Sequence, residues 1–512
     1  MKKEFKTTFS KLVVVLILIA LVICSGCGQD EEMLSLHPND TMSYSYSPLN
    51  PPNGAVYHDM FFKEYGTNPF IDTEDDHLST FGMDVDTASY SITRRYIMDG
   101  HLPPTEAVRV EEFVNAFNYN YVPPVTGDFA VHIEAAPSRF GDGKRIQLLR
   151  IGIKGRVIPN ENRKDAILTF VIDVSGSMEL ESRLELVKRA LNLLVEQLRP
   201  EDKVGIVVYG TRARVVLPHT SIEAHREILA AINSLQPEGV TNAEEGLRLG
   251  YELALRNARR GSINRVILCS DGVANVGKTG AGDILKEIRA HVQEGITLST
   301  IGFGMGNYND VLMEQLADNG NGNYAYVDTL NEARRVFVEN LTGTLQLIAK
   351  DAKVQVDFNP NVVSRFRLLG YENRRLEHEQ FRDDKADGGE IGSGHSVTAL
   401  YEIKLHEEAD GKIATVSIRY EDPDSHRVTE LSEDIFSSQL VDSFEESPTE
   451  FQLAAAVAEF AEILRKSYWA KDGSLEEVHK VVRNVSARMN NEQVIELISL
   501  VKKAISYQNR DD

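Results

Sequence analysis

The hydrophobic residues of this chain follow different patterns in different regions. Between residues 161 and 348, apolar runs of strand length alternate with helix-length stretches whose apolar residues recur every three or four positions. This alternation predicts a doubly wound α/β domain, a mostly parallel sheet covered by helices on both faces. The predicted strands include 166–173, 203–210, 265–271 and 296–304.

The segments that flank this domain have other periods. Residues 349–440 alternate apolar and polar positions, which predicts a β-rich domain, and residues 441–512 contain three amphipathic helical stretches. Upstream, residues 79–160 predict two helices and then a β-hairpin with strands at 129–136 and 146–154. Because a lone hairpin is only marginally stable, we expect it to join the strands of the later β-rich domain. The α/β domain would then be an insertion between β-rich and helical segments.

The first 26 residues have the pattern of an export signal. Lysines outnumber acids before an unbroken apolar run of twelve residues, Leu12–Ile23. As a helix this run would be about 18 Å long, short of the roughly 30 Å of a bilayer's hydrocarbon core, so it predicts a signal peptide rather than a membrane span. Residues 27–78 are rich in Ser, Pro, Asn and Tyr without apolar periodicity, which predicts a flexible tether.

The sequence CSGC at residues 24–27 resembles the lipobox of bacterial lipoproteins, where a small residue and a glycine precede a lipidated cysteine. The resemblance implies that residues 1–26 are removed and that Cys27 carries the lipid. The protein would then be anchored to the cell membrane on its extracytoplasmic side, in a bacterial envelope. Cys269 would be the one remaining thiol, in a predicted buried strand, so no internal disulfide is expected.

Polar side chains gather where the predicted strands end. They are Asp173, Ser175 and Ser177 after one strand, Thr241 before a predicted helix, and Asp271 at the end of another strand. Ligands of open α/β sheets gather outside the carboxyl ends of the strands, so we expect these side chains at one edge of the sheet. Two carboxylates and three hydroxyls, without His or Cys, suit Mg²⁺ with retained waters better than zinc, with Mn²⁺ or Ca²⁺ as alternatives.

This set resembles the metal-ion-dependent adhesion site of von Willebrand factor type A domains, whose pattern is Asp-x-Ser-x-Ser, a distant Thr and a distant Asp. The resemblance implies that Ser175, Ser177 and Thr241 bind the metal through their hydroxyls. Asp173 and Asp271 would bind it or hold its waters. With few charges in contact, the metal would stay electrophilic, and an Asp or Glu carboxylate of a partner protein would complete its shell.

The resemblance extends beyond this site. DVDTASY and LPPTEAVRVEE upstream, and GYENRRL downstream, are similar to bacterial von Willebrand type A lipoproteins, so it covers most of residues 80–508. In many relatives the last helix of the domain shifts when a ligand completes the metal shell. The corresponding segment here, 330–346, runs directly into the β-rich domain, so we expect ligand binding to be transmitted to that domain.

The charge composition limits the classes of partner that the protein can have. The chain has 512 residues with 55 Lys and Arg against 77 Asp and Glu, a net charge of −22. A field of that sign repels phosphate backbones, so nucleic acid is not an expected partner. We expect a lipid-anchored binding or adhesion protein, not an enzyme, with a protein ligand. The alternative is a scaffold for envelope assembly in which the metal only stabilises a loop.

A second motif favours a competing function. Residues 272–279, GVANVGKT, match the phosphate-loop pattern G-x-x-x-x-G-K-T, which would make the protein a nucleotide binder. Asp271 would crowd the phosphates with negative charge, and an exported protein meets little nucleoside triphosphate. We therefore expect Lys278 to be a solvated loop lysine.

Two further groups of acids invite a metal interpretation. Asp84 and Asp86 precede the first predicted helix, and Asp86 or Thr87 is expected to cap it. The loop 383–390 loosely resembles a calcium loop, but Lys385 occupies a ligand position. We expect capping and turn roles for the first group and a solvated loop for the second.

Overall fold

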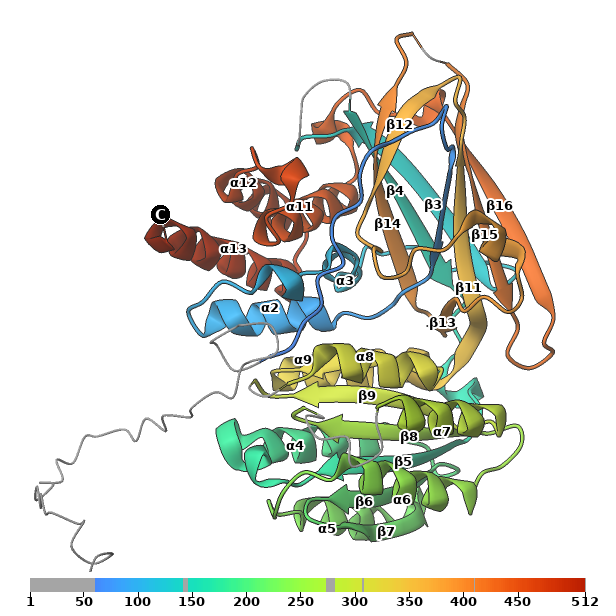
Figure 1. The fold of residues 1–512 in the computed structure, drawn as a ribbon, viewed down its shortest axis with the longest axis vertical. Helices are drawn as coiled ribbons and strands as arrows, with labels where there is room; N and C mark the ends of the chain where they lie inside the picture. The colour runs from blue at the N-terminus through green and yellow to red at the C-terminus, as the bar shows by residue number, and fades with distance from the viewer. Residues whose placement is uncertain (1–59, 141–145, 273–280, 306–307, 409, 512) are drawn as a thin grey trace, which may run out of the picture. The chain divides into compact units, whose positions relative to one another are not determined.

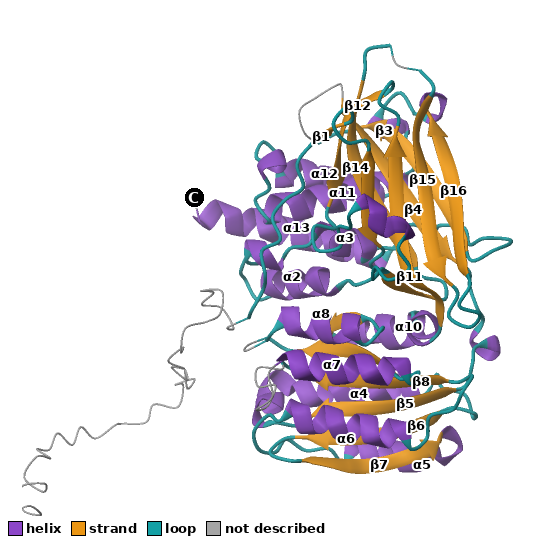
Figure 2. Ribbon diagram, turned by 45° about the vertical axis from the view of Figure 1, so that its right-hand side comes forward, coloured by secondary structure: helices purple, strands orange, loops and turns teal. Residues whose placement is uncertain are grey.

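The structure is a computed structural model that describes residues 60–140, 146–272, 281–305, 308–408 and 410–511. The predicted signal peptide, Cys27, residues 28–59 of the predicted tether and residues 273–280 of the phosphate-loop motif lie outside the described residues. Over the described ranges, no helix combines the length and the apolar character that a membrane span needs. The described chain forms three β-sheets with helices packed against them (Figures 1 and 2).

The predicted α/β domain contains a six-stranded sheet. Its strands are β5 (Ala166–Asp173), β6 (Lys203–Tyr209), β7 (Ala213–Ser221), β8 (Ile263–Ser270), β9 (Thr297–Phe303) and β10 (Tyr324–Val327). The spatial order is β10-β9-β8-β5-β6-β7, and all neighbours are parallel except the edge strand β7. Every residue of the central strand β5 is buried, as a strand covered on both faces requires. The predicted doubly wound, mostly parallel sheet is confirmed.

Helices cover both faces of this sheet (Figure 1). They are α4 (Arg183–Val195), α5 (His225–Asn233), α6 (Ala243–Leu255), α7 (Ala281–Gln293), α8 (Asp310–Asn319), α9 (Leu330–Arg334) and α10 (Leu341–Leu345). Successive β5 side chains point to opposite faces. Phe170 packs in the apolar cluster of α4, α5, α9 and α10, and Val171 in that of α6, α7 and α8.

The other two sheets form the β-rich domain. Their strands are β1 (Ile71–Asp72), β2 (Leu78–Gly82), β3 (Phe129–Pro137), β4 (Ile146–Gly155), β11 (Leu347–Phe358), β12 (Val363–Leu369), β13 (Gly389–Gly392), β14 (Ser396–Leu405), β15 (Lys412–Glu421) and β16 (Val428–Phe436). One sheet has the order β1-β12-β14-β4-β3 and the other β13-β11-β15-β16, with β2 also against β11. Ile151 and Val354, one from each sheet, share an apolar cluster, so the sheets pack face to face.

The hairpin β3–β4 is part of this domain. Strand β4 pairs antiparallel with β14, with Ile151 opposite Ala399. The sequence-based expectation that the hairpin joins the later strands is confirmed, and the α/β domain is inserted between them.

A group of helices covers the outer face of the β4–β14 sheet (Figure 2). They are α2 (Ala88–Met98), α3 (Val110–Asn115), α11 (Thr449–Leu464), α12 (Leu475–Ser486) and α13 (Glu492–Asp511). Phe113 of α3 and Phe460 of α11 share an apolar cluster with Leu148 of β4 and Leu400 of β14. Residues from both ends of the chain therefore build one layer.

The expected cap of α2 is wrong. Thr87 occupies the N-cap position, but its side chain makes no capping hydrogen bond. The Asp86 carboxylate instead accepts a hydrogen bond from the backbone N–H of Tyr324 at 3.0 Å, in strand β10 of the α/β domain. A contact across two domains has displaced a local one.

Candidate metal centre

The turn after the central strand gathers three of the predicted site residues. Asp173, the last residue of β5, is fully buried, and its Oδ1 accepts a hydrogen bond from the Ser175 backbone N–H at 2.8 Å. Its Oδ2 accepts a hydrogen bond from the Ser270 hydroxyl of β8 at 3.0 Å. The Ser175 and Ser177 hydroxyl oxygens are 3.1 Å apart. The carboxylate and both hydroxyls therefore share one turn.

Thr241 lies in the loop that precedes α6. Two backbone hydrogen bonds of 2.5 and 3.1 Å join residues 238–239 of this loop to residues 174–176 of the turn. The loop is thereby held at the sheet edge where the turn lies. Asn242 is the N-cap of α6, and its side chain accepts the capping hydrogen bond, so the Thr241 hydroxyl is not needed for capping.

Asp271 follows β8, the strand beside β5, and has an unexpected partner. Arg183, at the start of α4, donates a hydrogen bond from Nη1 to Asp271 Oδ2 at 2.8 Å and another to the Met305 carbonyl. Both charged side chains are buried. A Cβ on Gly304, where φ is +79°, would lie 2.2 Å from Arg183 Nε, so the glycine makes room for the guanidinium. One of the two predicted carboxylates is thus neutralised by an arginine.

Asp173 retains an uncompensated charge. Burial, and then the charge of Asp271, raises the pKa of Asp173 to about 6, although hydrogen bonds from Ser175 and Ser270 act in the opposite direction. A carboxylate that is costly to ionise alone is stabilised by a nearby cation. The hard oxygen donors at this edge fit a divalent cation such as Mg²⁺.

Two residues of the site were not predicted from the sequence. Ser270 is the last residue of β8, and its hydroxyl donates a hydrogen bond to the Asp173 carboxylate. Arg183 is the first residue of α4, where a cation is disfavoured by the helix dipole unless an acid faces it. That misplaced charge is the one sequence signal that could have predicted a buried acidic partner. Cys269, in contrast, is buried as expected, and burial raises the pKa of its thiol.

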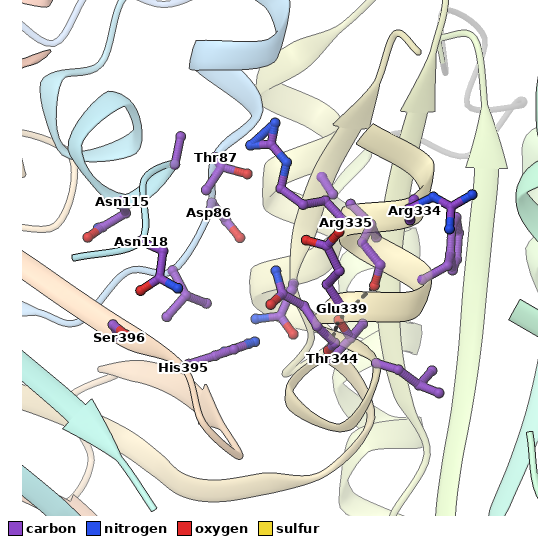
Figure 3. Close-up of a pocket in the computed structure, with 18 of the residues that line it drawn as sticks. Asp86, Thr87, Asn115, Asn118, Arg334, Arg335, Glu339, Thr344, His395 and Ser396 are labelled. Carbon is purple, nitrogen blue, oxygen red and sulfur yellow. Dashed lines mark hydrogen bonds between the residues drawn. The ribbon is translucent and has the colours of Figure 1, made fainter. Parts of the chain in front are cut away.

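The segment predicted as one helix over 330–346 is divided in three. A π-helical stretch, Arg335–Glu339, separates α9 from α10. This segment lines a cavity of about 900 Å³, whose opposite wall includes Asp86 and His395. Figure 3 shows Arg335 and Glu339 on one side of this cavity facing Asp86 and His395 on the other. Strand β11 begins at Leu347, directly after α10, so the segment connects the two domains.

Comparison with known proteins gives matches along the chain. The model described as von Willebrand factor type A domain matches residues 168–341, and one described as von Willebrand factor matches residues 56–149. The model described as Uncharacterized protein YfbK, C-terminal, matches residues 343–506.

Similar proteins include two curated relatives and a solved structure. The chain is 35% identical over 471 residues to Uncharacterized protein YfbK of Escherichia coli, a match that covers 86% of this chain and 80% of the relative. It is 24% identical over 320 residues to Uncharacterized protein sll0103 of Synechocystis, covering 61% and 75%. The solved von Willebrand factor type A from Catenulispora acidiphila is 15% identical, with 72% and 91% covered and a TM-score of 0.43.

Proposed function

Since the chain belongs to the family of the Escherichia coli protein YfbK and contains a von Willebrand factor type A domain, we propose that it binds a protein partner through a divalent cation. The cation is Mg²⁺, held by the hydroxyls of Ser175, Ser177 and Thr241. Asp173 and Asp271 hold its waters. The observation that carries this proposal is the turn after β5, where the buried Asp173 carboxylate, anchored by Ser270, lies beside two adjacent hydroxyls.

The pairing of Asp271 with Arg183 supports a partner that offers a carboxylate. Because the guanidinium neutralises Asp271, Asp173 is the main negative charge that faces the cation. When bound, the cation supplies a positive centre that this edge does not fully neutralise. An Asp or Glu side chain of a partner completes the charge balance and the oxygen shell. The proposed activity is binding without turnover.

The divided segment 330–345 supports a route from the metal edge to the β-rich domain. π-helical turns in α-helices occur frequently at functional sites, and this one borders a cavity with room for the segment to move. We propose that partner binding shifts this segment and that β11 carries the change onward. A disulfide engineered to tie α9 to α4 should then alter partner affinity, and unchanged affinity in the oxidised protein would refute the coupling.

The N-terminal sequence supports lipid anchoring. The predicted tether cannot extend to residue 78, because Met60 and Phe62 are buried and β1 pairs with β12. We propose that Cys27 carries the lipid and that the segment between Cys27 and Met60 displays the domains on the extracytoplasmic side of the cell membrane. As a flexible coil of about 32 residues, this tether would have a mean reach of roughly 30 Å. Such a reach allows the metal edge to meet partners within the envelope.

The test is a capture experiment with the full chain in detergent. It is immobilised, incubated with detergent-solubilised envelope in Mg²⁺, washed, and eluted with EDTA. Asp173→Ala removes the buried carboxylate, and the matched control Asp165→Ala changes a half-exposed acid at the opposite end of β5. We expect a partner that EDTA releases and that only Asp173→Ala fails to retain. Retention that neither EDTA nor Asp173→Ala affects would instead favour the scaffold function.

A further inference from the structure

Three sequence motifs outside the metal edge meet in one buried cluster. They contribute Asp84 from DVDTASY, Glu111 and Glu112 from the VRVEE stretch, and Tyr371 and Arg374 from GYENRRL. Asp84 is 4% exposed, Glu111 1% and Glu112 0%. Buried carboxylates are rare unless they are paired or bind a metal, so three in one place need a compensating charge.

The carboxylates of Asp84, Glu111 and Glu112 are close enough to share one ion. Each offers an oxygen atom, and these three atoms lie within 4.8 Å of one another. Calcium binds oxygen at about 2.3–2.6 Å, so three oxygens around one ion are at most roughly 5 Å apart. The spacing therefore fits a single calcium-sized cation.

One oxygen of this cluster lacks any hydrogen-bond partner. Glu111 Oε2 accepts a hydrogen bond from the Tyr371 backbone N–H at 3.0 Å, but Oε1 is buried and finds no donor among the described residues. A Cβ on Gly370, where φ is +80°, would lie 2.4 Å from Glu111 Oε2, so the backbone is shaped around this carboxylate. Glu111, which has one oxygen within 4.8 Å of an oxygen of Asp84 and of Glu112, is therefore only half satisfied by hydrogen bonds, and a cation shared by the three acids would satisfy it.

The second glutamate is also only partly satisfied. Glu112 Oε2 accepts a hydrogen bond from the Ser89 backbone N–H at 2.7 Å. Its Oε1 lies 2.5 Å from Arg109 Nε as an ion pair, without hydrogen-bond geometry. This oxygen is therefore paired with a charge but accepts no hydrogen bond within the described structure.

The arginines around the cluster are shared with other acids. Arg109 also pairs with Asp310 and Glu314 of α8. Arg374 contacts Asp84 at 3.2 Å and additionally pairs with Glu314 and Asp318. Two guanidiniums therefore face more carboxylates than they can neutralise.

We propose that Asp84, Glu111 and Glu112 bind one Ca²⁺, separate from the metal edge of the α/β domain. Calcium fits better than magnesium because the ligands are protein carboxylates in a buried site, whereas Mg²⁺ retains several waters. The ion balances the charge of the carboxylates for which Arg109 and Arg374 are shared with the acids of α8. It thereby fastens the N-terminal helices and the β-rich domain to the α/β domain.

The test measures calcium uptake by the full chain in detergent, after chelation and in the presence of excess Mg²⁺. Equilibrium dialysis with metal analysis should give one Ca²⁺ per chain, and Ca²⁺ should raise the thermal midpoint beyond the effect of Mg²⁺. Asp173→Ala should leave this uptake unchanged, which separates this proposal from the proposed partner-binding site. If the chain without substitutions takes up no Ca²⁺ at millimolar concentration, the proposal is overturned.

Variants then locate the ion. Glu111→Gln keeps the shape and removes one charge, so it should weaken Ca²⁺ binding by at least about tenfold. Glu112→Gln serves as the second variant if the first does not fold. The control is Asp387→Asn, which lies with Asp351 and Glu390 in another group of three acids and has an exposed side chain. Binding that survives both glutamine variants, or that only Asp387→Asn abolishes, would overturn the assignment.

Discussion

Arg183 donates a hydrogen bond to the Asp271 carboxylate over 2.8 Å, and both side chains are buried at the edge where the predicted metal ligands lie. This pair keeps two acids of the site, Asp173 and Asp271, from repelling each other at full strength. It also leaves Asp271 with one oxygen committed to a guanidinium. A role in holding metal-bound water suits Asp271 better than direct ligation.

Replacing Arg183 by Met should make folding depend on the metal. The change leaves a buried carboxylate unpaired, which costs about 3–5 kcal/mol in the free energy of unfolding. Mg²⁺ should recover part of this loss because it supplies positive charge beside Asp173. Urea unfolding in EDTA and in Mg²⁺ measures the difference, with the exposed Arg189→Met on the same helix as control. An equal loss in both buffers would argue against a cation at this edge.

Proton and metal should compete at Asp173. Its pKa in the folded protein is about 6, against 3.8 for an unperturbed aspartate, so the metal-free protein loses stability as pH rises from about 4 through about 6. Metal binding needs the ionised form, and at about pH 5 roughly one-tenth of the carboxyl is ionised. Mg²⁺ affinity, measured by calorimetry, should therefore fall about tenfold between pH 7.5 and pH 5. An affinity independent of pH would exclude Asp173 from the metal's surroundings.

Glu459 of α11 should cause a second loss of stability, between about pH 4.5 and pH 8. Burial and the charges of Glu462 and Glu402 raise its pKa to about 8, and its Oε1 has no hydrogen-bond partner within the described structure. Its folded pKa exceeds the unfolded 4.5, so stability falls as pH rises from about 4.5 through about 8 and stays low above that. Glu459→Gln should stabilise the protein by about 1–3 kcal/mol at pH 9. Chemical unfolding across pH tests this, and the exposed Glu476→Gln should show no such gain.

The lipid anchor has a direct genetic test. Cys27→Ser should remove the acylated residue and release the protein from the membrane fraction, whereas Cys269→Ala, which changes a buried core thiol, should not. Fractionation combined with metabolic labelling by a fatty acid measures both. Membrane retention and labelling of Cys27→Ser would refute the lipobox interpretation.

Much of the α/β domain follows from its sequence. Buried parallel strands require continuous apolar runs, so Ile167–Ile172 could be assigned as a central strand with its polar residues after the carboxyl end. The turn from Asp173 to Ser177 is local, and its contacts follow from its spacing. The alternation of apolar and polar residues also predicted the hairpin. Because a hairpin is unstable alone, it was expected to pair with the later strands, and β4 does pair with β14.

Contacts between distant segments were not predictable in this way. Arg183 meets Asp271, and Asp84 meets Glu111, because whole elements pack together, and hydrophobic periodicity does not specify which polar residues then face each other. Asp86 is the clearest case. Its position favoured a helix cap, but its carboxylate instead accepts a hydrogen bond from the backbone N–H of Tyr324 in another domain.

Direct metal counting tests the proposed adhesion site most simply. The full chain in detergent is titrated with Mn²⁺, and electron paramagnetic resonance measures the free ion. The protein without substitutions is compared with Asp173→Ala and Asp165→Ala. We expect Asp173→Ala to bind one Mn²⁺ fewer than the protein without substitutions and Asp165→Ala to bind the same number. Equal Mn²⁺ binding by all three proteins would contradict a metal centre at the end of β5.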